Sequence, residues 1–218
     1  MTRSNRASRP RIPTPLAPHD ATALEPERDY EAIAFTNLEL TGQQAAGVRF
    51  LGCALSRCAL DGCSLPKASF RDVTIEHLRA VETDLAQSSW VDVVVADSLL
   101  AGTQLFDADQ RRVTFRDCKL DATNFRGATL RNVRFERCIL SDADFGSATL
   151  RHTSFQQCRL LAADFSKATL EQVDLRGTEL AIARGYEALG GAIVDSAQLV
   201  TLAPALARHL GIIVRDDD

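Results

Sequence analysis

The sequence lacks long apolar runs: no stretch approaches the roughly 20 apolar residues of a membrane span. Its first residues, MTRSNRASRPRIPTPLAPHD, have no apolar core of the kind that secretory signals carry, so we expect a cytoplasmic protein. The formal charge of −4 is too small to demand a nucleic-acid or membrane partner, and we expect no direct nucleic-acid binding.

The usual signatures of catalysis are also missing. The four histidines, at positions 19, 77, 152 and 209, form no Ser-His-Asp or Cys-His grouping, and no glycine-rich phosphate loop is present. We therefore expect neither enzymatic activity nor a cofactor.

The chain does have a five-residue period. Of the thirty positions from Phe35 to Leu180 in steps of five, twenty-seven hold Phe, Leu, Ile, Val or Trp, the exceptions being Ala45, Ala80 and Gln110. The position two residues earlier is small in twenty-six of the thirty units, and the other three positions hold nearly all the charge. This period is neither helical nor that of a plain strand, and it indicates a solenoid with one flat face per unit.

All six cysteines occupy the small position, and Cys118, Cys138 and Cys158 recur every twenty residues. Phe and Leu alternate at the large position from Phe115 to Leu170, so like residues also recur within this period and predict a four-sided coil. Cys53, Cys58 and Cys63 would face inward on three sides of one coil, where thiols could hold a soft metal. Because the repeat dictates their spacing and cysteine is a small apolar residue, we interpret all six as free thiols in the core, with no metal site.

Stretches such as Ala143-Asp144-Phe145, Ala163-Asp164-Phe165 and Thr123-Asn124-Phe125 resemble the A(D/N)LXX unit of bacterial pentapeptide-repeat proteins. The resemblance covers roughly two thirds of the chain. It implies an all-β solenoid, a right-handed quadrilateral β-helix. We expect a disordered Arg/Pro-rich tail at 1–28, the β-helix at 29–182 and a helical cap or dimerisation segment at 183–218.

In the last segment, Asp195 or Ser196 is a plausible N-cap for a helix from about Ala197. Pro204 should break or restart this helix, and Gly211 should end it. Leu199, Leu202, Leu206 and Leu210 could share one apolar stripe, either as an end cap or, as gyrase-binding family members suggest, as a homodimer interface.

Charge and apolar residues are unevenly spread over the outward positions. Asp72 to Gln110 holds eight acids and one base, whereas Arg111 to Arg137 holds eight bases and three acids. In the segment from Asp72 to Gln110, which we call the acidic band, several outward positions are apolar. We expect these side chains to lie outside the core: Val81, Ala86, Val91, Val94, Ala96, Leu99, Ala101 and Phe106. Exposed apolar patches rimmed by charge often bind partners. The alternative is that β-branched residues occur here only because they suit a strand surface. The candidate partner surface comprises Val91, Asp92, Val94, Asp97, Leu99, Phe106 and Asp107. A basic stripe comprises Arg111, Arg131 and Arg151. In pentapeptide-repeat proteins Asp and Asn just before the large residue often support the backbone, so the resemblance implies this role for the column Asp84, Asn124, Asp144 and Asp164.

Two functions remain open. Resemblance to gyrase-binding members, which are linked to fluoroquinolone tolerance, implies an acidic rod that mimics duplex DNA in the topoisomerase. The acidity here is confined to about two coils, which limits such mimicry. The alternative is a scaffold that binds another protein through the apolar, acidic surface between Val91 and Phe106.

Overall fold

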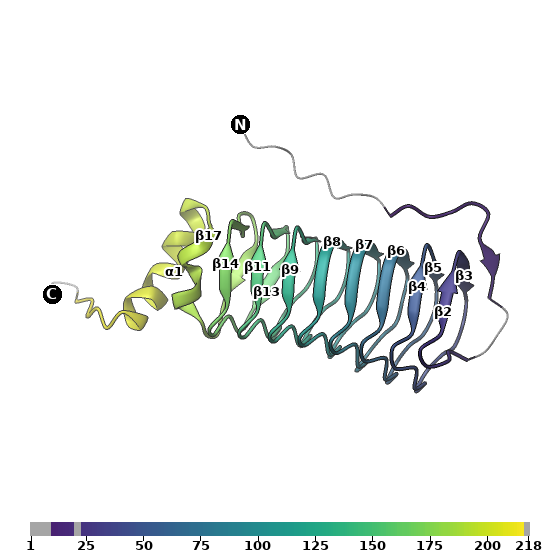
Figure 1. Ribbon diagram of the computed structural model, residues 1–218. Coiled ribbons are helices and arrows are strands. Elements are labelled where there is room, and N and C mark those ends of the chain that lie inside the picture. Colours follow the sequence, from purple (N-terminus) through teal and green to yellow (C-terminus); the bar gives the residue numbers. More distant parts are fainter. Residues whose placement is uncertain (1–9, 20–22, 216–218) are drawn as a thin grey trace.

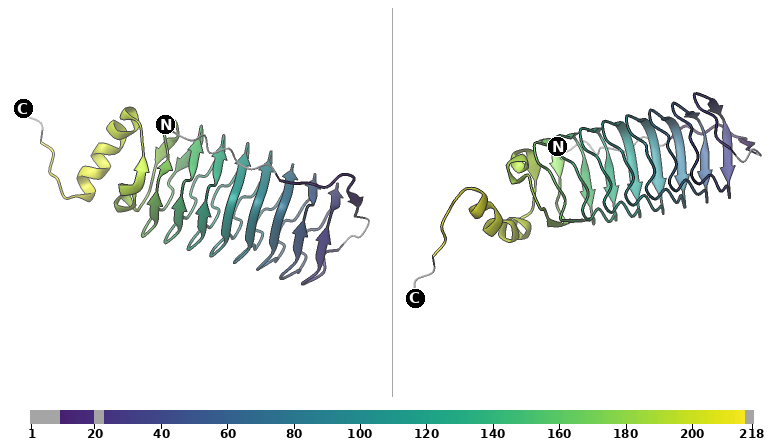
Figure 2. Two further views of the ribbon diagram at one scale, coloured as in Figure 1. Left: turned by 45° about the horizontal axis from the view of Figure 1, so that its top comes forward. Right: turned by 90° about the horizontal axis from the view of Figure 1, so that it is seen from below.

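The computed structural model describes residues 10–19 and 23–215. It is a parallel β-solenoid of about nine turns, with β3 near one end and the helix α1 at the other (Figure 1). Two further views show the coils stacked as a straight rod (Figure 2). No helix in the described part of the chain is long and apolar enough to cross a membrane.

The twenty-residue period is confirmed by the strand register. Phe115 pairs with Phe135, and Phe135 with Phe155, so the three lie in one column and are completely buried. Each coil therefore has four walls, one for each five-residue unit. We number the walls 1 to 4 and identify each by the column of large inward residues that it carries. Wall 1 carries the column from Tyr30 to Leu170, wall 2 that from Phe35 to Leu175, wall 3 that from Leu40 to Leu180, and wall 4 that from Ala45 to Phe165.

Walls 1 and 2 are built of regular strands. In the middle of the rod, β6 (Ser69–Glu76), β7 (Ser89–Ala96) and β8 (Asp109–Arg116) each cross from wall 1 to wall 2. The other wall 1 strands are β2 (Asp29–Glu31), β4 (Arg49–Leu51), β9 (Thr129–Arg131), β11 (Thr149–Arg151) and β14 (Thr169–Glu171). The other wall 2 strands are β1 (Ala17–Pro18), β3 (Ile33–Thr36), β5 (Ala54–Ser56), β10 (Arg134–Glu136), β12 (Ser154–Gln156), β15 (Val173–Asp174) and β17 (Ala192–Ile193).

Walls 3 and 4 are held mainly by single parallel bridges between successive coils, such as Lys119 to Ile139 and Asn124 to Asp144. Wall 3 gains regular strands only near the C-terminal end, where β13 (Arg159–Leu161) pairs with β16 (Glu179–Ala181). The rod thus has two strand-rich walls and two walls of turns.

The corners follow a strict rule that the sequence analysis missed. From Glu27 to Gly177, every fifth residue, two places after the large inward residue, has a φ between 50° and 72°. This left-handed conformation suits glycine best and Asn or Asp next, which explains why those residues recur there.

The core consists of stacked columns whose large members change walls along the rod. On wall 1 the rings of Phe50 and Phe70 stack 5.1 Å apart, and those of Phe70 and Trp90 4.3 Å apart. Beyond Trp90 the wall 1 column continues with Gln110 and then leucines, while phenylalanines fill walls 2 and 4. Gln110 is completely buried at this change, and neither its amide nitrogen nor its amide oxygen has a hydrogen-bond partner among the described residues.

At the N-terminal end, residues 10–19 are ordered against the rod and differ from the disorder expected for the 1–28 segment. Ala17 and Pro18 form β1, which pairs in parallel with β3, and the backbone N–H of Arg11 donates to Asp72 at 2.9 Å. Residues 10–19 therefore lie along the rod, where they cover the open edge of β3. Residues 1–9 of the expected Arg/Pro-rich tail lie outside the described residues.

At the C-terminal end a 3₁₀ helix, η1 (Tyr186–Gly191), leads to β17 and then to α1 (Ser196–His209). Asp195 is the N-cap, as predicted, in a capping box with Gln198. The Gln198 side chain also donates to the carbonyls of Leu175 (2.6 Å) and Thr178 (2.8 Å), so it satisfies open groups of the last coil. This is the predicted helical cap.

The prediction that Pro204 breaks the helix is wrong. Pro204 lies inside α1, and the helix runs on to His209, before Gly211 at a φ of +71°. A proline removes one backbone hydrogen bond. Leu202, which is buried, and Leu206, which is partly buried, pack against the core on either side of this point and hold the helix together.

Candidate functional site

The residues of the candidate partner surface encircle the rod. Val91 lies on wall 1, Val94 on wall 2, Leu99 on wall 3 and Phe106 on wall 4, because consecutive units occupy consecutive walls. Asp92, Asp97 and Asp107 lie at three different corners. These residues therefore form a belt around the rod and not one patch. A flat partner could contact the part of the belt on two adjoining walls at most.

The exposure of the belt is lower than the sequence suggested. Ala86 and Ala96, expected outside the core, are 4% and 1% exposed. Ala96 lies in register between Glu76 and Arg116, and the larger neighbours on adjacent coils cover its methyl group. Val91, Val94 and Leu99 are partly buried, and Phe106 at 37% is the one large apolar side chain of the belt that is exposed.

The three carboxylates of the belt have a structural explanation. Asp92, Asp97 and Asp107 all occupy left-handed corners, with φ between 51° and 56°, where a short polar side chain is favoured. The guanidinium of Arg112 also donates two hydrogen bonds, of 2.7 and 2.6 Å, to the carboxylate of Asp92 and neutralises its charge. Asp97 and Asp107 are exposed and form no salt bridge with any described residue, which leaves them as the carboxylates that a partner can reach.

A shallow hollow on wall 3 was not found from the sequence. It has a volume of about 470 Å³ and is lined by Thr41, Asp61, Gly62, Arg79, Val81, Glu82 and Leu99. A second hollow of about 270 Å³, on the other side of Arg79, is lined by Glu39, Arg57, Cys58, Ala59 and His77. The missed signal is a small outward residue in each hollow, Gly62 in the first and Ala59 in the second, which leaves space between longer side chains. Leu99 is thus the belt residue with a concave surface beside it.

The basic stripe forms a ladder, as its column predicts. Arg111 pairs in register with Arg131, and Arg131 with Arg151. Repulsion is relieved by carboxylates: Arg131 lies 3.6 Å from Asp109, and Arg151 lies 3.0 Å from Glu171.

The positive charge that follows the acidic band is concentrated on walls 1 and 2, which becomes visible only when each residue is assigned to its wall. Over residues 109–157, walls 1 and 2 carry seven arginines and three acids, a net charge of +4. Over residues 119–167, walls 3 and 4 carry four bases and four acids, a net charge of zero. Several of the arginines have partners: Arg137, for example, forks onto Asp117 with two bonds of 2.7 Å and holds the pKa of that carboxyl below its usual value.

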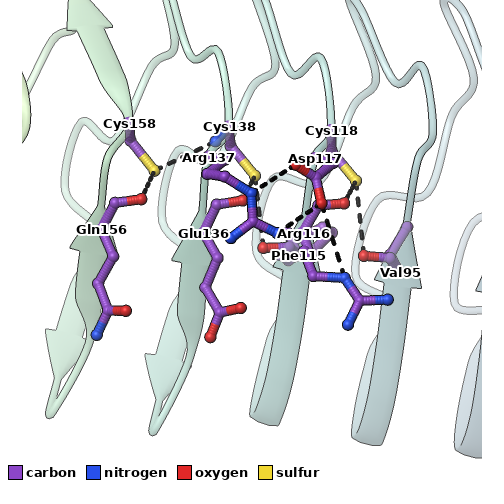
Figure 3. Close-up of polar contacts among 10 residues, drawn as sticks. All are labelled: Val95, Phe115, Arg116, Asp117, Cys118, Glu136, Arg137, Cys138, Gln156 and Cys158. Atoms are coloured by element: carbon purple, nitrogen blue, oxygen red, sulfur yellow. Dashed lines mark hydrogen bonds and ion pairs between the residues drawn. The ribbon is translucent and has the colours of Figure 1, made fainter.

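The cysteine ladder has a backbone-supporting role (Figure 3). The thiol of Cys138 donates to the carbonyl of Phe115 at 3.4 Å, and that of Cys158 to Phe135 at 3.3 Å. The Cys158 sulfur also accepts the backbone N–H of Cys138 at 3.4 Å, as the Ser98 hydroxyl does for Leu78. Each thiol is thus engaged with the backbone of an adjacent coil.

The three cysteines of one coil follow the same pattern. The thiols of Cys53, Cys58 and Cys63 donate to carbonyls of the preceding coil. Burial raises the pKa of all three, which keeps them protonated and poor as metal ligands. Among the described residues no three His, Cys, Asp or Glu side chains are arranged to hold a metal ion.

The column expected to support the backbone does so. Asp144 accepts the N–H of Gly146 at 2.7 Å, and Asp84 and Asp164 likewise accept the N–H two residues further on, at 2.9 and 2.7 Å. Asn124 accepts from Arg126 in the same way at 3.0 Å. These bonds fix the turns of wall 4.

The leucine stripe of α1 is divided. Leu202 is 4% exposed, and Leu206 is partly buried against the last coil. Leu199 at 53% and Leu210 at 70% face solvent, as do Ile212, Ile213 and Val214 beyond the helix. One part of the stripe therefore caps the rod, and the other part leaves an apolar surface uncovered.

Comparisons with known proteins agree with this fold. A family model described as a pentapeptide repeat region matches residues 48–125 and 128–187. No curated protein matches the chain significantly. A trypsin-treated form of QnrB1, a plasmid-mediated fluoroquinolone resistance protein, is 20% identical with a TM-score of 0.42, over 91% of this chain and 95% of that one. HetL from the cyanobacterium Nostoc, involved in heterocyst differentiation regulation, is 21% identical with a TM-score of 0.36, over 81% of this chain and 92% of that one.

Proposed function

Because the chain belongs to the pentapeptide-repeat family, we propose that it is a non-enzymatic rod that binds a protein partner, with a type II DNA topoisomerase (gyrase) as the target. The filled interior leaves only outward side chains for recognition. Specificity must then lie in the uneven surface of the middle coils.

The observation that carries the topoisomerase proposal is that two exposed carboxylates, Asp97 and Asp107, form no salt bridge with the described residues. They lie at opposite corners of the coil, so they fit a binding surface that surrounds the rod. A topoisomerase attracts closely spaced phosphates at its DNA-binding surface, and unpaired carboxylates on a rod offer the same sign of charge. Because Arg112 neutralises Asp92 and the basic surface of walls 1 and 2 follows directly, the mimicry is partial.

A supercoiling assay with purified gyrase tests this proposal. We expect the protein to alter supercoiling at micromolar concentration, and the double change Asp97→Asn with Asp107→Asn to abolish the effect. Asp142→Asn is the matched control, because Asp142 is an exposed corner carboxylate outside the acidic band with the same left-handed backbone. An unaltered assay with the native protein removes gyrase as the target. Equal inhibition by native and doubly changed protein removes mimicry alone.

A second function, a scaffold for another protein, is favoured by the wall 3 hollow beside Leu99 and by the exposed Phe106 ring on wall 4. These walls adjoin, so one partner can cover both. We expect Leu99→Ser and Phe106→Ser to lose partners in a pull-down. Leu51→Ser, at an apolar side chain with 41% exposure on wall 1, is the control and should keep them. Partner sets identical to the native one for all three variants would count against the scaffold.

We further propose that the uncovered apolar surface of the C-terminal segment forms a homodimer. Leu199, Leu210 and Ile213 are each more than half exposed, although a water-facing helix gains nothing from such side chains. Leu199→Lys with Leu210→Lys should halve the mass measured by light scattering, whereas Thr201→Lys, at an exposed polar position of α1, should not. A native mass equal to that of one chain refutes the dimer.

A further inference from the structure

The first coil has an edge that residues 10–19, which we call the strap, cover in cis. Ala17 donates to the carbonyl of Ala32 at 2.9 Å, and His19 to that of Ala34 at 3.0 Å, so the strap acts as one more strand beside β3. The His19 ring packs on Phe35, with centroids 4.4 Å apart, and edge-on against Tyr30 at 5.3 Å. Two carbonyls and two aromatic rings at the end of the core are thereby covered.

The strap is held by few other contacts. It runs along the corner between walls 1 and 2 from Asp72, which accepts the Arg11 N–H, past Gly52 to β3 (Figure 2). Ile12 and Leu16 are partly buried, and most of the other strap side chains are exposed. Segments with so little buried area open at low free-energy cost.

An uncovered strand edge with apolar rings beside it pairs readily with another strand. We propose that the first coil is a pairing surface for a second copy of this chain, and that the strap occupies this surface in the single chain. The pairing is head to head, because α1 and Gln198 close the opposite end of the rod. Such an interface uses the same surface on both copies, so by itself it stops at a pair.

Two glycines provide a matched test. Gly52 and Gly62 have φ of +59° and +60°, but a Cβ on Gly52 would lie 2.8 Å from Cδ of Pro13, whereas a Cβ on Gly62 would meet nothing within 4 Å. Glutamine occupies this corner conformation elsewhere in the rod, at Gln87, Gln157 and Gln172. Gly52→Gln should therefore lift the strap, while Gly62→Gln makes the same change without touching it.

Sedimentation velocity over a range of concentrations measures the outcome. We expect Gly52→Gln to form a species of twice the mass of Gly62→Gln, and a synthetic peptide of residues 10–19 to reverse this association. Both variants, and the deletion described below, also carry Leu199→Lys and Leu210→Lys, which prevent the C-terminal pairing proposed above, because pairing at both ends would join the rods into longer assemblies. Equal masses for the two variants at every concentration would overturn the proposal, as would association that the peptide leaves unchanged.

Deletion of residues 1–19 gives a second measurement. If far-UV circular dichroism shows that the shortened chain keeps its β-structure, its mass should double relative to Gly62→Gln, and an undoubled mass refutes the proposal. If the shortened chain unfolds, the comparison of the two full-length glycine variants decides.

Discussion

Replacing Gln110 by leucine should stabilise the protein. Gln110 is completely buried, and its two amide atoms have no hydrogen-bond partner among the described residues. An unsatisfied buried polar group costs roughly 1–3 kcal/mol. Leucine is close to glutamine in size, so the change creates neither a large cavity nor severe overpacking. It would also continue the column in which Leu130 is the next member.

The expected gain is about 2 kcal/mol in the free energy of unfolding, which corresponds to a rise of roughly 4–8 °C in Tm for a chain of this size. Trp90, the single tryptophan, is the register neighbour of Gln110 and reports unfolding at this point by its fluorescence. Urea titration followed by that fluorescence and by circular dichroism should give a higher midpoint with an unchanged slope.

Leu130→Gln is the matched control, one coil further along the same column. It introduces an unsatisfied amide and removes a buried leucine, so it should destabilise by roughly 3–5 kcal/mol. The reasoning is refuted if Gln110→Leu leaves the midpoint unchanged or lowers it, because Gln110 would then have a stabilising role in the core.

Three further predictions concern the frame of the rod and its cap. Phe135→Ala, within a completely buried ring stack, should cost about 3–5 kcal/mol in chemical denaturation. Asp144→Ala should cost about 1 kcal/mol by removing the acceptor of the Gly146 N–H, and Asp144→Asn, which keeps a carbonyl oxygen, should restore most of it. Hydrogen bonds from the backbone N–H groups of Gln198 and Gly177 hold the pKa of Asp195 below its ordinary 3.8, so its stabilisation of α1 is present above that value and is lost as the pH falls through the lowered pKa. The protection of the amides in the first turn of α1, relative to their intrinsic exchange rates, should therefore fall below about pH 4, and Asp195→Asn should remove this pH dependence.

The five-residue period is sufficient to predict the four-walled coil, the twenty-residue register and the core columns. Phe115, Phe135 and Phe155 illustrate why: each unit turns the same way, so the inward side chains are set by local geometry and repeat with it. The N-cap at Asp195 was predictable because it depends on neighbours within three residues, whereas the backbone-supporting role of the column through Asp144 was expected from the family resemblance.

The environment of the outward residues depends on how successive coils stack. Exposure of Ala96 depends on Glu76 and Arg116, each twenty residues away, and the charge of Asp92 depends on Arg112 in the next coil. The strap and the exposed half of the leucine stripe depend on the rod's two ends, where the repeat no longer supplies a neighbouring coil. Such contacts join segments that the period does not relate, and the pattern of one unit therefore cannot specify them.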